Sequence, residues 1–364
     1  MTRVLACAVL LLLGLAAPAA ARPAPSPLGA TVNGFAREHD FSGTILVRER
    51  GYTLYSRAFG LADRANAVPA AMNTRYRIAS ITKLFTAVLI LQLAQEGRLD
   101  LNAPLRAALP DYPGEGAERV TVRQLLNHTS GIAQWDRVGS YQEAFRDGIE
   151  YYQRPLSAEA LLARCCSGPL AREPGQAFDY NNADYVVLGR IVERLTGKPF
   201  EDALAERILR PLGLDDTGMA RWDRIVERLA PTYFWRDDTR ALVAEMPFYW
   251  ENSYAAGGMY STAADLALFA DALYGGDRLL RPDLRQQLLT PGLDDYGYGL
   301  WSYSFTRGGR TWRVAKRPGS IMGANAVLYR LLDRNATIVI LANTNRTDLD
   351  VFAQRIADAL VGSP

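Results

Sequence analysis

The sequence predicts an α+β fold: an α/β sandwich whose antiparallel sheet is formed by segments from both ends of the chain, plus an inserted, mainly helical domain. Two strand-like runs lie near the amino terminus and three near the carboxyl terminus, and long helical segments separate them. We place a single domain over residues 28–364, with the helical insertion at roughly residues 84–250. The length of 364 residues, 49% of them hydrophobic, is ample for a well-buried core.

Both ends of the chain combine helical and strand-like patterns. A predicted helix over residues 30–39 precedes the first two strands, and a predicted helix over residues 348–360 follows the last three. Turn signals at residues 49–51 and 333–335 separate neighbouring strands. The five predicted strands are residues 43–48, 52–59, 311–315, 326–332 and 337–342.

Two segments in the middle of the chain have clear helical signals. Residues 81–95 are apolar on most faces, as expected of a buried helix, and Gly97 ends this segment. Residues 184–195 have one apolar face, Asn182 is a candidate cap, and a Gly-Lys-Pro sequence at residues 197–199 terminates the helix.

The amino terminus has the pattern of an export signal. A basic residue near the start, an apolar run and the small residues 19–21 predict a signal peptide over residues 1–21. Residues 22–27 contain three prolines and are predicted to be a linker. The protein is therefore expected to be periplasmic or secreted, with no membrane span after signal removal.

Composition argues against several function classes. The net charge is +2 without a basic tail or charge block, so no nucleic-acid partner is expected. The two histidines, His39 and His128, lack suitably spaced Cys, His or Glu partners, so we expect no metal site. Cys165 and Cys166 are adjacent, and we predict two buried thiols without a disulfide.

Candidate chemistry begins at Ser80, which lies three residues before Lys83 near the start of the predicted buried helix. Positions i and i+3 of a helix share a face, about 5–6 Å apart at Cβ, so the hydroxyl and the amine are expected to form a hydrogen bond. Burial lowers the pKa of an amine and makes it usable as a base, while the helix N-terminus favours an alkoxide.

Ser-x-x-Lys is a weak pattern by itself, and chance is the alternative interpretation. The composition strengthens the functional one, because the 41 basic residues comprise 38 arginines and three lysines: Lys83, Lys198 and Lys316. Arginine stays protonated and cannot act as a base. A lysine at position 83 of such an arginine-rich chain favours a role in proton transfer.

A second candidate motif is the sequence Tyr-Asn-Asn at residues 180–182, directly before the second helix. The phenol of Tyr180 is a candidate acid or base beside an ammonium group. The amide of Asn182 is able to donate to a substrate carbonyl and to accept from its N–H. The alternatives are a core aromatic residue for Tyr180 and a helix cap for Asn182.

The third candidate motif is Arg-Pro-Gly-Ser at residues 317–320. Gly319 would allow a substrate to lie close to the strand backbone. The backbone N–H of Ser320 is a candidate partner for that of Ser80 in an oxyanion hole. A surface turn is the alternative, because Pro-Gly is a turn signal.

With these motifs in order, the chain resembles the serine β-lactamase and penicillin-binding protein superfamily, in particular class C β-lactamases, D-alanyl-D-alanine carboxypeptidases and β-lactamase-like esterases. Together the matching segments extend over nearly the whole mature chain. They are residues 74–83, 125–132, 174–175, 180–182, 185–189, 211–214, 257–262 and 298–300.

The resemblance implies a β-lactamase/transpeptidase-like fold and acyl transfer through an acyl-serine that water hydrolyses, without a cofactor. It implies Ser80 as nucleophile, Lys83 as its base or proton relay, and Tyr180 as the second acid or base. Asn182 would orient the substrate amide, and the N–H groups of Ser80 and Ser320 would bind the oxyanion.

The third motif departs from the family pattern, which usually has Lys-Thr-Gly or His-Thr-Gly. Arg317 keeps the positive charge and is expected to bind a substrate carboxylate, but the threonine is lost and Pro318 has no N–H. A register shift by one residue would turn Lys316 to the site instead. His128 and Ser130 lie in a family turn, where structural roles are expected.

The expected partner is a small-molecule or peptide substrate, and a D-Ala-terminated peptide is the leading interpretation. An ester, a β-lactam and a non-catalytic penicillin-binding sensor are the alternatives. The oligomeric state stays open.

Overall fold

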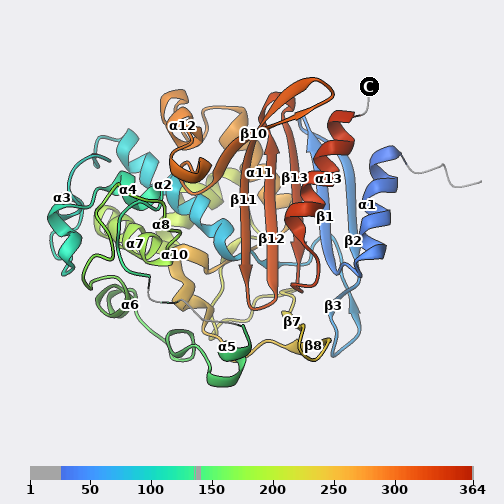
Figure 1. Cartoon of the computed structure of the whole chain (residues 1–364), viewed down its shortest axis with the longest axis horizontal. Helices are drawn as coiled ribbons and strands as arrows, with labels where there is room; N and C mark the ends of the chain where they lie inside the picture. Colours follow the sequence, from blue (N-terminus) through green and yellow to red (C-terminus); the bar gives the residue numbers. More distant parts are fainter. Residues whose placement is uncertain (1–25, 135, 137–140, 363–364) are drawn as a thin grey trace, which may run out of the picture.

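The computed structural model describes residues 26–134, 136 and 141–362 (Figure 1). Its central feature is a six-stranded antiparallel sheet in the order β10-β11-β12-β13-β1-β2. The predicted α+β class, with an antiparallel sheet built from both ends of the chain, is confirmed. The six strands are β1 (Gly43–Glu49), β2 (Tyr52–Phe59), β10 (Trp301–Arg307), β11 (Arg310–Ile321), β12 (Ala324–Leu331) and β13 (Ala336–Ala342).

The two ends of the chain meet at the pairing of β1 with β13, from Gly43 opposite Ala342 to Glu49 opposite Ala336. Successive residues of a strand point to opposite faces of the sheet. Ile338 and Ile340 therefore pack with α1 (Pro27–Glu38) and α13 (Leu349–Gly362) on one face. The alternate residues of β13 pack on the other face, in the larger core that includes α2 (Thr82–Gln95) and α11 (Ala263–Gly275).

The segment between β2 and β10 is mainly helical and lies largely at the β10–β11 side of the sheet, opposite α1 (Figure 1). Its division from the sheet as an inserted domain stays a prediction. The remaining helices are α3 (Leu105–Ala108), α4 (Val122–Leu126), α5 (Tyr141–Asp147), α6 (Ala158–Cys165), α7 (Asn182–Thr196), α8 (Phe200–Leu204), α9 (Arg210–Leu212), α10 (Tyr254–Gly257) and α12 (Pro282–Leu289). Small sheets contain β3 (Leu61–Asp63), β4 (Val68–Pro69), β5 (Tyr76–Arg77), β6 (Gly218–Met219), β7 (Tyr233–Arg236), β8 (Ala241–Ala244) and β9 (Met259–Ser261).

The first helix begins earlier than the sequence predicted. Ser26 caps α1, because its hydroxyl accepts a hydrogen bond from the N–H of Gly29 at 3.1 Å, and Pro27 is the first helical residue. Proline suits this position because its φ is already helical and the missing N–H would have had no partner in the helix. The predicted signal peptide over residues 1–21 lies outside the described residues.

Strand β11 is longer than predicted and includes the whole third motif. Its pairing with β12 continues to Ile321, whereas β10 accompanies it only as far as Lys316. Pro318 therefore lies where β11 has β12 as its single partner strand, the kind of edge position that tolerates a residue without an N–H. The surface-turn alternative for this motif is wrong.

In the described part of the chain, no helix is long and apolar enough to span a membrane. Within the same residues, no three His, Cys, Asp or Glu side chains gather in a way that would hold a metal ion. The buried thiol of Cys166 donates to the Leu161 carbonyl oxygen at 3.7 Å, while the side chain of Cys165 lies outside the described part.

Candidate active site

Ser80 lies in a 3₁₀ turn, Ala79–Ile81, that leads directly into α2. Ala79 has a φ of +44°, in the left-handed region that non-glycine residues rarely adopt. Two hydrogen bonds hold this turn: Ile78 N–H donates to the Met259 carbonyl at 2.9 Å, and the Thr82 hydroxyl donates to the Ala79 carbonyl at 2.7 Å. The strained backbone thus presents Ser80 from a rigid support.

Lys83 is fully buried one helical turn after Ser80. Its Nζ lies 3.0 Å from Ser80 Oγ, 2.6 Å from Asn182 Oδ1 and 2.8 Å from the Ala256 carbonyl oxygen. The last two oxygens are only able to accept hydrogen bonds. A neutral amine that donates its two hydrogens to them keeps its lone pair for the Ser80 hydroxyl, which is the arrangement that a base requires.

Electrostatics favour the neutral form of this amine. Burial is the main reason that the pKa of Lys83 is lowered, and the Arg317 cation acts in the same direction. The Tyr180 phenol and the Asp136 carboxylate oppose the lowering of this pKa without reversing it.

Tyr180 is the second side chain, after Lys83, that contacts the hydroxyl of Ser80. Its hydroxyl donates to Ser80 Oγ at 2.8 Å and accepts from Arg317 Nη2 at 2.6 Å. Burial by itself opposes ionisation of the phenol, but the Arg317 and Lys83 cations lower the pKa of Tyr180 to about 8. The ring stacks on Trp301, with 6.0 Å between centroids, which holds the hydroxyl in place.

The expectation that Arg317 binds a substrate carboxylate requires correction. The side chain points to the Ser80 side, as the register of the motif implied, but the residue is only 1% exposed. Its guanidinium donates to the Ser80 carbonyl at 2.6 Å, the Tyr296 hydroxyl at 2.9 Å and the Tyr180 hydroxyl. Arg317 is therefore a buried support for the nucleophile and the phenol. Lys316 pairs with Asp350 of α13 at 2.9 Å instead.

Gly319 has a packing role in addition to the expected close approach of a substrate, which stays a prediction. A Cβ at this position would lie 2.3 Å from the Ile78 carbonyl oxygen and 2.9 Å from the Ser80 nitrogen. The glycine thus allows β11 to pack against the turn that carries the nucleophile. The side chains of Ser80 and the exposed Ser320 line the same cleft, while the oxyanion role of their N–H groups stays a prediction.

Gly319→Ala is accordingly expected to slow acylation of Ser80 by about 10- to 100-fold, because a misplacement approaching 1 Å at a reacting atom has an effect of that order. The three nearest neighbours of the added methyl group are all backbone atoms, which cannot rotate away. The rate of covalent labelling checks this result. Gly34→Ala is the control, because an added Cβ there would meet nothing within 4 Å and Gly34 lies within helix α1 without a positive φ. A wild-type labelling rate in Gly319→Ala would contradict the proposed packing role.

Asn182 is not the helix cap. Asn181 caps α7 by accepting from the Ala183 N–H at 2.9 Å, and Asn182 is the first residue of the helix. The side chain of Asn182 is thereby free to enter the site, where Oδ1 accepts from Lys83. Its Nδ2 donates to Asp136 Oδ2 at 2.6 Å.

Asp136 is a site residue that the sequence analysis missed. Its carboxylate reaches Asn182 across a loop, so no helical or strand spacing connects the two positions. A lone aspartate 46 residues before its partner carries no sequence signal.

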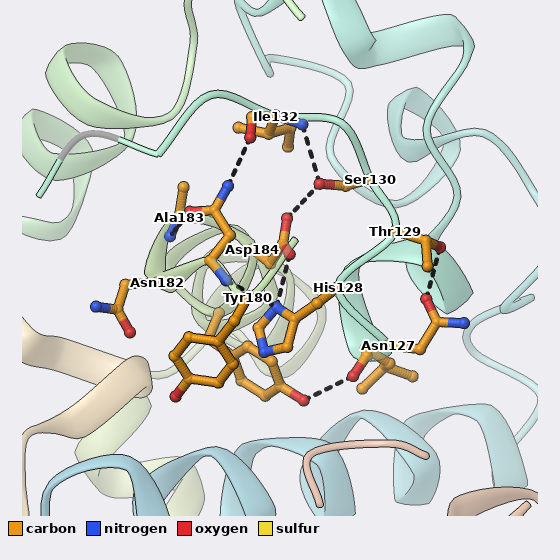
Figure 2. Close-up of polar contacts among 12 residues, drawn as sticks. Asn127, His128, Thr129, Ser130, Ile132, Tyr180, Asn182, Ala183 and Asp184 are labelled. Atoms are coloured by element: carbon orange, nitrogen blue, oxygen red, sulfur yellow. Dashed lines mark hydrogen bonds and ion pairs between the residues drawn. The ribbon is translucent and has the colours of Figure 1, made fainter. Parts of the chain in front are cut away.

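His128 and Ser130 form a buried polar cluster with Asp184, and the His128 ring lies beside the Tyr180 ring (Figure 2). His128 Nδ1 lies 2.8 Å from Asp184 Oδ2, and the Ser130 hydroxyl donates to the other carboxylate oxygen. Burial lowers the pKa of His128 and raises that of Asp184, so both groups favour their neutral forms. The Asn181 N–H faces His128 Nδ1 at 3.3 Å, so the cluster supports the loop that carries Tyr180. This placement is consistent with the structural role expected of His128 and Ser130.

The accessible part of the site is a small cleft of about 40 Å³ in front of Ser80. No charged side chain lines this cleft among the described residues. Its lining residues are Ala79, Ser80, Tyr152, Asn182, Ser253, Ala256, Gly257, Ser320 and Ile321.

Comparison with known proteins places these residues in a family context. A family model described as Beta-lactamase matches residues 28–363. Penicillin-binding protein 4* of Bacillus subtilis (strain 168) is 28% identical over 329 residues, which cover 84% of this chain and 69% of that protein. Esterase EstB of Burkholderia gladioli is 37% identical over 206 residues, covering 54% of this chain and 51% of that protein.

Solved structures agree with this assignment. A penicillin-binding protein from Bacillus halodurans has a TM-score of 0.76 at 28% identity, covering 90% of this chain and 98% of its own. The D-amino acid amidase from Ochrobactrum anthropi SV3 has a TM-score of 0.77 at 24% identity, covering 93% of this chain and 100% of its own. The similarity to the amidase shows a shared fold.

Proposed function

This chain belongs to the β-lactamase family and is a serine hydrolase of that family, and we propose that it cleaves a small amide or peptide substrate through an acyl-enzyme at Ser80. The observation that carries the proposal is the convergence of Lys83 Nζ and the Tyr180 hydroxyl on Ser80 Oγ, at 3.0 and 2.8 Å. A serine hydroxyl is a weak nucleophile unless an adjacent base activates it.

The proposed reaction begins when Lys83 accepts the Ser80 proton and Oγ attacks the substrate carbonyl carbon. The oxyanion that forms is stabilised by the N–H groups of Ser80 and Ser320. Tyr180 then gives its proton to the leaving nitrogen, the carbon–nitrogen bond breaks, and Lys83 returns a proton to the phenolate. Water next attacks the acyl carbon of the Ser80 ester and loses a proton to the base. The bond between that carbon and Ser80 Oγ then breaks, Oγ takes the proton back from the base, and the acid product leaves.

The second proton-transfer group is the reason to favour an amide or peptide. An amine leaves only after its nitrogen has been protonated, so a group that delivers a proton is essential. With a pKa of about 8, the Tyr180 phenol is largely protonated at neutral pH yet gives up its proton readily. A D-Ala-terminated peptide is the first substrate to test, since penicillin-binding proteins are among the relatives.

Ester hydrolysis is the second candidate, and the burial of Arg317 favours it. Without a cation among the described residues that line the cleft, a terminal carboxylate has no ion-pair partner there. Substrates without a terminal carboxylate, such as simple esters or amino acid amides, avoid this difficulty. The esterase among the relatives agrees with such a preference.

Export is part of the proposal and is supported by the sequence pattern of residues 1–21. On this basis, the mature enzyme begins at Arg22 and works in the periplasm or outside the cell.

Treatment of the mature protein with a fluorophosphonate and with labelled penicillin, followed by mass spectrometry of its peptides, tests the acyl-enzyme. We expect a single adduct at Ser80 and none in Ser80→Ala. A wild-type protein that is never modified at Ser80 would disprove the proposed nucleophile and favour a non-catalytic binder.

A substrate panel then distinguishes the candidates, with Ser80→Ala as the blank in every assay. Release of D-alanine from D-Ala-D-Ala peptides would establish carboxypeptidase activity, and release of ammonia from D-amino acid amides would establish amidase activity. Turnover of p-nitrophenyl esters alone would decide for the esterase, and nitrocefin hydrolysis would decide for a β-lactamase.

A further inference from the structure

We propose that Asp136 is a positioning residue, which fixes the Asn182 side chain with its oxygen toward Lys83 and thereby keeps the Lys83 lone pair available for Ser80. The inference rests on the proposed acylation of Ser80. It assigns a role in that reaction to a residue outside the three sequence motifs.

The contacts of the amide carry the first step. Asn182 Nδ2 donates to Asp136 Oδ2 at 2.6 Å, and Asn182 Oδ1 accepts from Lys83 Nζ at 2.6 Å. An ionised carboxylate only accepts hydrogen bonds, so it selects the NH₂ end of the amide. In the reversed orientation, the amide oxygen would face the carboxylate without a proton between them, which is repulsive.

Asp136 is itself held by its neighbours. The Tyr152 hydroxyl donates to the same Oδ2 atom at 2.8 Å, and Gln134 Nε2 lies 3.2 Å from Oδ1. Tyr152 is 4% exposed and stacks on Phe248, with 4.3 Å between ring centroids. The carboxylate thus has a defined position from which it can orient another side chain.

The orientation matters because of what the amide presents to Lys83. With the amide oxygen toward the amine, the two hydrogens of neutral Lys83 go to Asn182 Oδ1 and to the Ala256 carbonyl. With the amide reversed, Nδ2 would donate to the Lys83 lone pair and occupy the electron pair that accepts the Ser80 proton. The same fixed orientation leaves the second hydrogen of Nδ2 for a substrate carbonyl.

Asp136→Ala tests this inference when it is combined with Asn182→Ala in a double-mutant cycle. The measurement is the second-order rate constant for fluorophosphonate labelling of Ser80. We expect Asp136→Ala to lower it about 10- to 100-fold, as misorientation at a reacting group does. In the Asn182→Ala background, the same change is expected to have less than about a threefold effect, because the amide through which Asp136 acts is then absent and the two losses are not additive.

Two further variants sharpen the test. Asp136→Asn keeps an oxygen that accepts from Asn182 and is expected to stay within about fivefold of the wild type, since the net contribution of such a bond is modest. Asp147→Ala is the control, because Asp147 is exposed and its carboxylate pairs with the neighbouring Arg146. It is expected to label at the wild-type rate. Asp136→Leu has no acceptor and fills similar space, so it serves if Asp136→Ala does not fold.

The outcomes separate the inference from the proposed function. Wild-type protein that is not labelled at Ser80 would overturn both. A labelled wild type together with an equally labelled Asp136→Ala would overturn the inference alone. An equal loss from Asp136→Ala with and without Asn182 would also overturn the inference, because Asp136 would then act independently of the amide.

Discussion

Lys83→Arg is expected to lower the rate constant for acylation of Ser80 by about 10³-fold, the middle of the range that general base catalysis contributes. The guanidinium group stays protonated at every accessible pH and has no lone pair to accept the Ser80 proton. It would also place a second permanent cation beside Arg317 in a buried site, where the amine it replaces is able to become neutral. Stopped-flow or quenched labelling with a fluorophosphonate measures the loss.

Lys198→Arg is the matched control for this substitution. Lys198 is exposed and pairs with Glu206, and it lies beyond the end of α7 opposite to the end that carries Asn182. We expect this variant to be labelled at the wild-type rate, which would show that replacing a lysine by arginine does not by itself slow the labelling of Ser80. Rapid acylation of a correctly folded Lys83→Arg protein would remove Lys83 from the role of base and leave Tyr180 as the candidate.

The sequence predicted the parts of the site that local geometry determines. Lys83 lies three positions after Ser80 at the start of a helix, so their contact follows from helical spacing alone. The approach of Tyr180, one hundred residues later, followed only from the resemblance to a family. The sheet was predictable for a related reason, since strand-like runs separated by turn signals at both chain ends are local features of the sequence.

The unpredicted parts depend on contacts between distant segments. Asp136 lies in a loop and contacts Asn182. Ala256 lies in the short helix α10 and contacts Lys83. Neither position has a distinctive spacing in the sequence. Arg317 was identified as a charge near the site, but its function depends on whether the guanidinium points outward to a substrate or inward to the protein. That choice follows from the close packing of β11 on the Ser80 turn, a tertiary feature that a Pro-Gly sequence does not reveal.

Arg317→Met is expected to raise the pKa of Tyr180 above its value of about 8, because the Arg317 cation is the largest attraction that stabilises the phenolate. A spectrophotometric titration at the phenolate absorption band checks this. Burial raises the pKa of other tyrosines near the site, such as Tyr185 and Tyr296, so the wild type should show one early step near pH 8. The early step should disappear from that pH range in the variant.

The same substitution is expected to slow acylation at neutral pH, and the sign follows from charge. Arg317 helps to lower the pKa of Lys83, so its removal raises that pKa and leaves more of the amine protonated at neutral pH. The acid limb of kcat/KM, which reports the free enzyme, should therefore move to higher pH. Arg317→Lys keeps the positive charge but replaces the planar guanidinium by a single ammonium group. Its pH profile should therefore lie between those of the wild type and Arg317→Met.

Circular dichroism distinguishes an electrostatic effect from unfolding, because Arg317 also donates to Ser80 and Tyr296 and its loss leaves buried acceptors without a donor. A folded Arg317→Met protein with an unchanged pH profile would contradict the electrostatic role. A shifted profile would instead show that the Arg317 charge acts on Lys83 and Tyr180 from its buried position. In that case, one chain is able to lack an exposed charge for a substrate carboxylate and still keep the acylation machinery, because the buried Arg317 side chain points to Ser80 and Tyr180.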